Sequence, residues 1–152
     1  MPDGLQTIGE EAFFCCTSLS TVSFPDGLQT IGGLAFSHTS LSSVSLPNGL
    51  QSIGEGAFSY CNSLSSVSLP DGLQTIGKEA FNGCKSLTSV YANMKVPIKL
   101  ENHQFNDKTM QYGTLYVPVG YRCAYMESEW KSFKDIKEFG TLNTDDLITN
   151  QV

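Results

Sequence analysis

The sequence predicts an α/β-type repeat solenoid, in which the chain coils through similar layers and short strands stack into a parallel sheet. Short 3₁₀ or helical turns are expected opposite the sheet, and an aromatic cap at the C-terminal end. A unit of 22 or 23 residues is present four times, in residues 2–24, 25–46, 47–69 and 70–92. Such a fixed period is typical of stacked repeats. After the last copy the period breaks and aromatic residues become frequent, which fits a segment that covers the final layer.

Each copy opens with Pro-Asp-Gly, or with Pro-Asn-Gly in the third copy. Proline presets φ and glycine supplies positive φ, so we expect the chain to reverse direction there. A short extended piece follows, with the sequence Leu-Gln-Thr-Ile or Leu-Gln-Ser-Ile, and each piece ends at a glycine. The glutamines of this piece are expected to form a ladder of stacked amides. They are Gln6, Gln29, Gln51 and Gln74.

The middle of each copy carries Ala-Phe followed three residues later by Cys or Thr. Its spacing is helical, but it has room for only one or two turns, so a 3₁₀ or brief α segment is expected. Equivalent residues stack on the neighbouring layer, which predicts a column of phenylalanines and a column of small core groups. The phenylalanines are Phe13, Phe36, Phe58 and Phe81. The small groups are Cys16, Thr39, Cys61 and Cys84. Cys15 and Cys123 lie outside this column, and the sequence leaves open whether either forms a disulfide.

The end of each copy, Leu-x-x-Val-x-Leu or a close variant, alternates apolar and polar residues as a half-buried strand does. Successive strands should form one parallel sheet. Its outward side chains, mostly small hydroxyl groups, are the first candidate binding surface, with soluble filler as the alternative. These residues are Thr21, Ser23, Ser43, Ser45, Ser66, Ser68, Ser89 and Tyr91.

The C-terminal part is predicted to close the array. Residues 93–112 keep some apolar residues as an irregular last layer, 113–120 form a strand, and a short helix is expected within 121–128. Trp130, Phe133, Ile136 and Phe139 then supply the aromatic cap. We therefore divide the chain into repeats at 1–92, an irregular layer and cap at 93–139, and a polar tail or linker at 140–152.

The repeated pattern L-x-x-I-G-x-x-A-F-x-x-C-x-x-L-x-x-V-x-L-P resembles the BspA-like leucine-rich repeat of bacterial and protozoan surface proteins. The run from Leu115 to Ile136 is similar to the segment that closes such arrays in Bacteroides-type proteins. The resemblance covers roughly residues 2–139. It implies the right-handed coil of a leucine-rich repeat and a cell-surface or secreted protein that adheres to other proteins or cells.

Charge and hydropathy exclude two classes of partner. The net charge of −6 and the pI of about 4.7 argue against nucleic acid, which requires a basic surface. No apolar stretch approaches the roughly 18 residues of a membrane span, so membrane insertion is not expected.

Met1 leads directly into a repeat, so we expect a fragment whose signal peptide is missing. Its first layer would expose Leu5, Ile8 and a strand edge, which predicts self-association through the N-terminal end.

Residues for catalysis are scarce. The two histidines, His38 and His103, are far apart, no nucleophile or phosphate-loop motif is present, and no cysteine or histidine spacing suits a metal. We expect no catalytic residue, no metal and no cofactor, and hence no enzyme. The acidic turn residues could attract a cation or be simply solvated; they are Glu10, Glu11, Glu55 and Glu79.

A second candidate binding surface is a strip of variable turn residues, with ordinary surface variation as the alternative. These residues are Phe14, His38, Tyr60 and Asn82. The sequence thus favours a non-catalytic interaction module that adheres to a host or bacterial protein or glycan. The alternative is a structural spacer or self-association scaffold that displays another domain.

Overall fold

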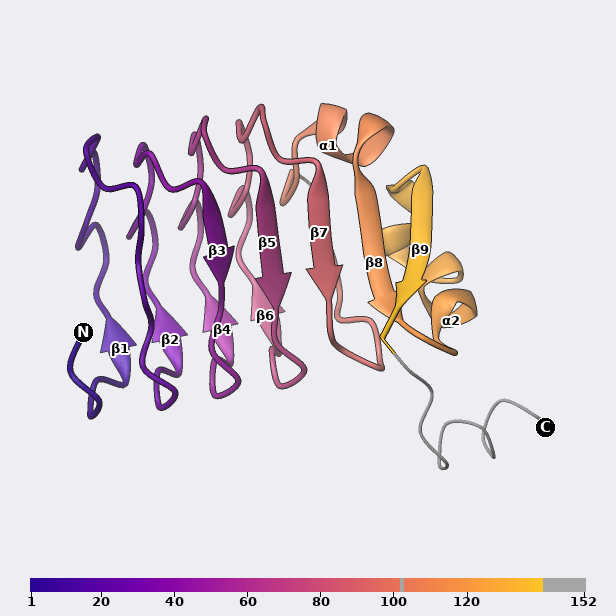
Figure 1. The fold of residues 1–152 in the computed structure, drawn as a ribbon, viewed down its shortest axis with the longest axis horizontal. Coiled ribbons are helices and arrows are strands. Elements are labelled where there is room, and N and C mark those ends of the chain that lie inside the picture. Colours follow the sequence, from indigo (N-terminus) through magenta and orange to yellow (C-terminus); the bar gives the residue numbers. More distant parts are fainter. Residues whose placement is uncertain (102, 141–152) are drawn as a thin grey trace.

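The computed structural model describes residues 1–101 and 103–140 and shows layers stacked along one axis (Figure 1). Two parallel sheets run along the array. The four-stranded sheet has the order β1-β2-β4-β6, with β1 at Thr7–Ile8, β2 at Thr30–Ile31, β4 at Ser52–Ile53 and β6 at Thr75–Ile76. The five-stranded sheet has the order β3-β5-β7-β8-β9, with β3 at Ser43–Ser45, β5 at Ser66–Leu69, β7 at Ser89–Ala92, β8 at Thr114–Pro118 and β9 at Asp135–Phe139. This arrangement confirms the predicted repeat solenoid.

The five-stranded sheet keeps equivalent residues in register. Val44 pairs with Val67, Val67 with Val90, and Val90 with Leu115, so the inward positions form one apolar row. The first copy is an exception, since Thr21 and Ser23 were expected on a strand and lie outside any strand. Backbone hydrogen bonds between the second copy and the first extend only as far as Ser20, whose carbonyl accepts from the Ser42 amide at 3.4 Å.

The turns of successive copies are bonded to one another as well as within themselves. The Phe36 amide donates to the Ala57 carbonyl at 2.7 Å, and the Phe58 amide donates to the Ala80 carbonyl at 2.8 Å. No residue of the repeated Ala-Phe segments is helical, so the expected 3₁₀ or α segments appear as hydrogen-bonded turns. Each turn begins at a residue with positive φ, such as Leu34 at 57°, and a left-handed residue interrupts a right-handed helix.

Close contact with the preceding layer explains the glycines that follow Ile31, Ile53 and Ile76 of the four-stranded sheet. A Cβ atom added to Gly54 would lie 2.5 Å from the Gly33 amide nitrogen, and one added to Gly77 would lie 2.5 Å from the Glu55 amide nitrogen.

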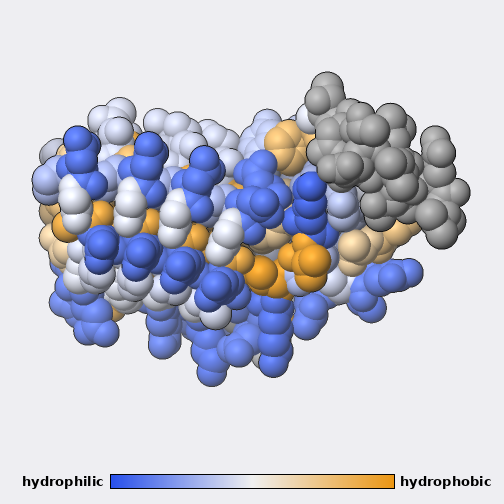
Figure 2. All heavy atoms as spheres, turned by 90° about the horizontal axis from the view of Figure 1, so that it is seen from below, coloured by the Kyte–Doolittle hydropathy of each residue, from blue (hydrophilic) through white to orange (hydrophobic). Residues whose placement is uncertain are grey.

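Figure 2 shows the end of the layers that carries the Pro-Asp-Gly turns, where hydrophilic and hydrophobic residues repeat in parallel rows. The glutamine column is joined through its backbone, since the Gln51 amide donates to the Gln29 carbonyl at 2.9 Å. The glutamine side chains are exposed or nearly so and make no ladder of their own in the described chain.

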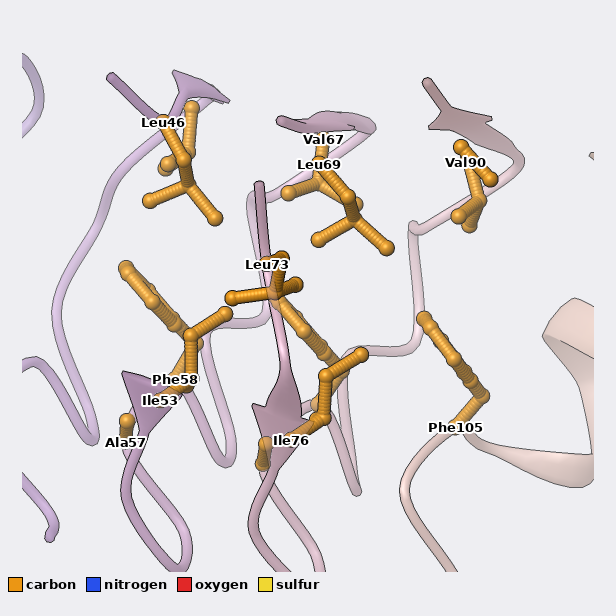
Figure 3. Close-up of a cluster of buried hydrophobic side chains, with 14 of the residues drawn as sticks. Leu46, Ile53, Ala57, Phe58, Val67, Leu69, Leu73, Ile76, Val90 and Phe105 are labelled. Atoms are coloured by element: carbon orange, nitrogen blue, oxygen red, sulfur yellow. The ribbon is translucent and has the colours of Figure 1, made fainter. Parts of the chain in front are cut away.

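The predicted phenylalanine column fills the core between the two sheets. Neighbouring rings stack at 5.1 Å for Phe13 and Phe36, 5.3 Å for Phe36 and Phe58, and 5.4 Å for Phe58 and Phe81. In Figure 3 the rings of Phe58 and Phe105 point toward side chains of the five-stranded sheet, such as Leu46 and Val90.

The column of small groups is confirmed in the second to fourth copies, where Thr39 is buried and donates to the Phe36 carbonyl at 2.9 Å. Cys61 and Cys84 are buried, and their thiols donate to the carbonyls of Phe36 and Phe58 at 3.1 and 3.0 Å. Cys16 was expected in the core and is exposed, because it belongs to the outermost described layer.

The cap packs on the last layer through aromatic rings and two side-chain hydrogen bonds. It contains α1 at Asp107–Tyr112, α2 at Arg122–Met126 and the 3₁₀ helix η1 at Glu129–Ser132. Trp130 is fully buried and its Nε1–H donates to the Ile98 carbonyl at 2.8 Å. The Tyr125 hydroxyl donates to the Met94 carbonyl at 2.5 Å. The predicted strand and short helix are confirmed as β8 and α2, whereas β9 was not anticipated.

The division of the chain at residue 92 stays a prediction, and the proposed tail lies outside the described residues from position 141 onward. Of the helices that the structure describes, none has the length and apolar character needed to cross a membrane.

Candidate functional site

The outward side chains of the five-stranded sheet form what we call the sheet face. It consists of two rows that cross the strands in register. One row is Ser43, Ser66, Ser89, Thr114 and Asp135, and the other is Ser45, Ser68, Tyr91, Tyr116 and Lys137. The two serines of β3 are exposed, and the sheet-face residues of β5 and β7 are half-buried. The structure thus brings six of the eight predicted residues together, while Thr21 and Ser23 are exposed beside the sheet without joining a strand.

An aromatic patch ends the sheet face on the side of the cap. The Tyr91 and Tyr116 rings stack at 4.5 Å with 10° between their planes, and the Phe139 ring meets Tyr91 edge-on at 5.3 Å. All three side chains are half-buried. The sequence prediction included Tyr91 but missed Tyr116, and it assigned Phe139 to the cap. The alternation of β8 was the available signal, since Leu115 and Val117 point inward and place Tyr116 on the opposite side.

Hydrogen bonds hold the surroundings of the aromatic patch. The Asn93 side-chain amide donates to Ser68 Oγ at 3.1 Å and to the Leu69 carbonyl at 2.7 Å. Thr114 Oγ1 donates to Asp135 Oδ2 at 2.7 Å, and Lys137 Nζ lies 3.7 Å from the same carboxylate oxygen. The rows are therefore uncharged except at the β9 edge, where one carboxylate and one ammonium lie together.

The second surface is a hollow over the turns of the first four copies, which we call the turn groove. It is open, has a volume of about 450 Å³, and includes Phe14, Leu34, His38 and Tyr60 in its lining. The His38 and Tyr60 rings stack at 5.0 Å with 16° between their planes, and Phe14 meets His38 edge-on at 5.9 Å. Three of the four residues of the predicted variable strip are thus brought together. Asn82 is half-buried and does not line the hollow.

The turn groove is acidic. Four glutamates line it, and the lining contains no lysine or arginine; they are Glu10, Glu11, Glu55 and Glu79. Its floor is a pair of buried serines, with Ser37 Oγ and Ser59 Oγ 2.7 Å apart. Stacking of the turns therefore gathers carboxylates that the sequence showed only as separate turn residues.

The groups that titrate abnormally lie in the interior. Hydrogen bonding to Cys61, followed by burial, raises the pKa of the Cys84 thiol above its ordinary value. Burial, and to a smaller extent the charge of Asp71, raises the pKa of the Tyr125 phenol. Both groups are held in their neutral forms inside the protein, away from the two surfaces described above.

The structure offers little for catalysis or metal binding. His38 lines the turn groove, whereas His103 lines a different hollow together with Lys99 and Glu101. Within residues 1–101 and 103–140 no group of three histidine, cysteine or acidic residues could hold a metal ion. All five cysteines, including Cys15 and Cys123, are free thiols. The described surface features, an exposed sheet face and open hollows, are suited to binding.

The stacked layers, the two parallel sheets and the C-terminal cap define the protein class as a leucine-rich-repeat solenoid, a repeat fold of the kind used for interaction. A family model described as "BspA type Leucine rich repeat region (6 copies)" matches residues 1–111. The chain belongs to this BspA-type family. No curated protein gives a match.

Two solved structures are similar to the chain. The T. pallidum leucine rich repeat protein is 42% identical with a TM-score of 0.58, and the match covers 59% of this chain and 42% of that protein. A leucine-rich repeat protein from Bacteroides ovatus is 24% identical with a TM-score of 0.58, and the match covers 90% of this chain and 38% of that protein. The chain spans less than half the length of either protein. The second match supports the fold alone.

Proposed function

We propose that this chain is a non-catalytic interaction module of a bacterial cell-surface or secreted protein, and that it adheres to a host or bacterial protein or glycan through the sheet face. The observation that supports this proposal is the aromatic patch of Tyr91, Tyr116 and Phe139, half-buried at the end of two uncharged rows. Tyrosine is enriched among the residues that dominate binding energy at protein interfaces.

Geometry favours a protein ligand over a glycan. Sugars bind aromatic residues mainly through open ring faces, but the facing sides of Tyr91 and Tyr116 are stacked on each other at 4.5 Å. The edge of Phe139 contacts Tyr91 in addition. Such a cluster is already ordered in the free protein, so binding would cost little side-chain entropy.

The serine rows extend the contact surface. Their hydroxyl groups can donate and accept hydrogen bonds without the desolvation cost of a charge. Each layer adds the same two positions, so a longer array would add weak contacts in proportion to its length. Several weak contacts on one rigid body give high avidity.

The alternative is a structural spacer or self-association scaffold. The rigid stacked core supports the spacer role, and the open first layer supports self-association. In that layer β1 pairs on one side only, and Leu5 and Phe13 are half-buried. In either case the aromatic patch would have no ligand.

The test is a binding assay of the purified chain on immobilised matrix proteins, glycans and bacterial cells. The double variant Tyr91→Ser/Tyr116→Ser places on β7 and β8 the residue that β5 carries at the paired position, Ser68, so the fold should tolerate it. We expect binding to fall about tenfold or more.

The matched control is Tyr112→Ser, which removes a tyrosine that is 74% exposed and lies outside the sheet face. Circular dichroism should show the same fold for all variants. Unchanged binding in the double variant, or an equal loss in the control, would refute adhesion through the sheet face. Concentration-dependent association without any ligand would favour the scaffold. Surface labelling of the source cells tests the proposed location.

A further inference from the structure

We propose that the turn groove binds an extended, basic segment of a partner protein, with arginine or lysine at every third residue. This surface shares no residue with the sheet face, so the inference does not depend on the adhesion proposed above.

Charge complementarity identifies the occupant. The groove lining carries four glutamates and no lysine or arginine. Lys78 and Lys99 line an adjoining hollow, together with Glu101 and with Glu55 and Glu79 of the groove. Neither Glu10 nor Glu11 lines that second hollow. An approaching cation therefore meets carboxylates that have no ion-pair partner within the described part of the chain.

Apolar surface distinguishes this hollow from a merely acidic turn. Phe14 is 41% exposed, Leu34 36% and Tyr60 45%. The stacked rings of His38 and Tyr60 form a rigid wall beside the carboxylates. Lysine and arginine pack their aliphatic stems on apolar surfaces and keep their charged ends in a polar environment, which suits this combination.

The spacing of the layers gives the spacing of the ligand. Parallel strands lie about 4.8 Å apart, so the turns of the first and third copies are roughly 10 Å apart. Glu10 and Glu11 belong to the first copy and Glu55 to the third, with Glu79 in the next layer. An extended chain of the polyproline II type covers about 9 Å in three residues and has three residues per turn, so side chains three positions apart lie on the same side. Side chains at positions 1 and 4 of a peptide can thus reach the two acidic ends of the groove together.

The fixed backbone supports recognition of a linear segment. The turns are bonded across layers, as in the Leu34 amide donating to the Glu55 carbonyl at 2.9 Å and the His38 amide to the Ser59 carbonyl at 3.0 Å. The floor is tied by the contact of Ser37 with Ser59. The backbone positions that carry the glutamates are therefore held at a constant separation before any ligand binds.

The experiment uses a fluorescent seven-residue peptide, Arg-Gly-Ser-Arg-Gly-Ser-Arg with blocked ends, and measures its anisotropy with increasing amounts of the full chain. We expect saturable binding that weakens as salt is raised, because exposed charges are screened. Glu55→Gln/Glu79→Gln should weaken binding about fivefold, and Tyr60→Ser should weaken it about threefold.

The matched control is Glu127→Gln/Glu138→Gln, which removes the same charge from exposed positions of the cap. This control should keep the affinity for the peptide within about twofold of that of the parent protein, because salt screens exposed charges that lie outside the groove. An equal loss in this control would show a general charge effect and would overturn the proposal. So would equal binding of a peptide with glutamate in place of arginine.

Two further outcomes would also overturn the proposal. Nuclear magnetic resonance shift changes that map to the sheet face, with none at His38 or Tyr60, would place the peptide elsewhere. Sedimentation that shows self-association, lost in Glu55→Gln/Glu79→Gln, would make a second copy of the chain the occupant in place of a partner's basic segment.

Discussion

The ring of Phe105 stacks on the ring of Phe81 at 5.3 Å with 5° between their planes. Phe105 lies in a segment with no clear copy of the repeat, yet it continues the aromatic column of the four copies. Its other contacts are with the cap, since Phe133 meets it edge-on at 5.2 Å and Trp130 lies 5.8 Å away. Phe105 therefore joins the aromatic column of the regular core to the aromatic side chains of the cap.

The aromatic column predicts a graded cost of truncation. Phe58 is fully buried and stacks on both sides, so Phe58→Ala should lower the free energy of unfolding by about 4 kcal/mol. Phe13 is half-buried and stacks on one side only, so Phe13→Ala should cost about half as much. Urea unfolding followed by circular dichroism measures both. Equal losses would mean that stacking between layers does not determine stability.

The glycine column gives a matched pair of substitutions. Gly77→Ala would place a Cβ atom 2.5 Å from a backbone nitrogen of the preceding layer, and should destabilise the protein by about 2 to 3 kcal/mol. Gly9 occupies the same position of the repeat, but a Cβ atom added there would have no neighbour within 4 Å. Gly9→Ala should change the free energy of unfolding by less than about 0.5 kcal/mol. Thermal melts of the two variants test this, and similar shifts would contradict the close approach of the layers.

Trp130 should be essential to the cap. Trp130→Phe removes the donor to the Ile98 carbonyl and part of a fully buried side chain. The unpaired carbonyl and the cavity should together cost about 2 to 4 kcal/mol. Tyr112→Phe, which changes an exposed side chain on α1, is the control and should leave the melting temperature unchanged. A stable Trp130→Phe variant would show that the stacked layers do not need the cap.

Tyr125 predicts a loss of stability at alkaline pH. Burial raises the pKa of its phenol above the ordinary value of about 10, so the folded state holds this proton more tightly than the unfolded state does. The stabilisation that this pKa difference gives to the folded state is fully present below about pH 10. It is lost as the pH rises from there toward the folded-state pKa. Urea midpoints measured between about pH 8 and 11 should fall at the upper end, by a smaller amount in Tyr125→Phe.

The control for this pH series is Tyr112→Phe, which should keep the slope of the parent protein because Tyr112 is exposed. At neutral pH, Tyr125→Phe should cost about 1 kcal/mol, since the Met94 carbonyl loses its donor. An identical alkaline slope in parent and Tyr125→Phe would assign the effect to other groups.

The regular part of the fold could be predicted because each copy repeats the same turn, glycine and core residues. The stack from Phe13 to Phe81 and the in-register valines follow from that period alone. The layer around Phe105 was harder to predict, because two of its residues differ from the clean copies. His103 stands where those copies carry Glu, Leu or Gly, and Gln104 stands where they carry Ala. His103 nevertheless has a positive φ of 67°, like the equivalent residues of the other turns. Backbone conformation persists there after the side-chain pattern is lost.

The candidate surfaces could be predicted only in part, for a related reason. The sequence showed that the repeat position of His38 and Tyr60 varies between copies. The stacking of their two rings, however, depends on how two turns lie against each other. Tyr60 also lies over Gly83, where an added Cβ atom would come within 2.5 Å of its ring. Tyr116 and Phe139 meet Tyr91 only because β8 and β9 join the same sheet, and β9 has a single buried residue, Ile136, to signal it.

The contrast between the two ends of the array has a mechanical consequence. At the cap, Trp130 and Tyr125 are fully buried and bonded to carbonyls of the preceding segment, whereas Phe13 and Leu5 of the first layer are half-buried. A pulling force applied between the two ends should therefore peel the described chain from the N-terminal side. Each layer would release a loop of 22 or 23 residues before the next one yields, and the cap would unravel last.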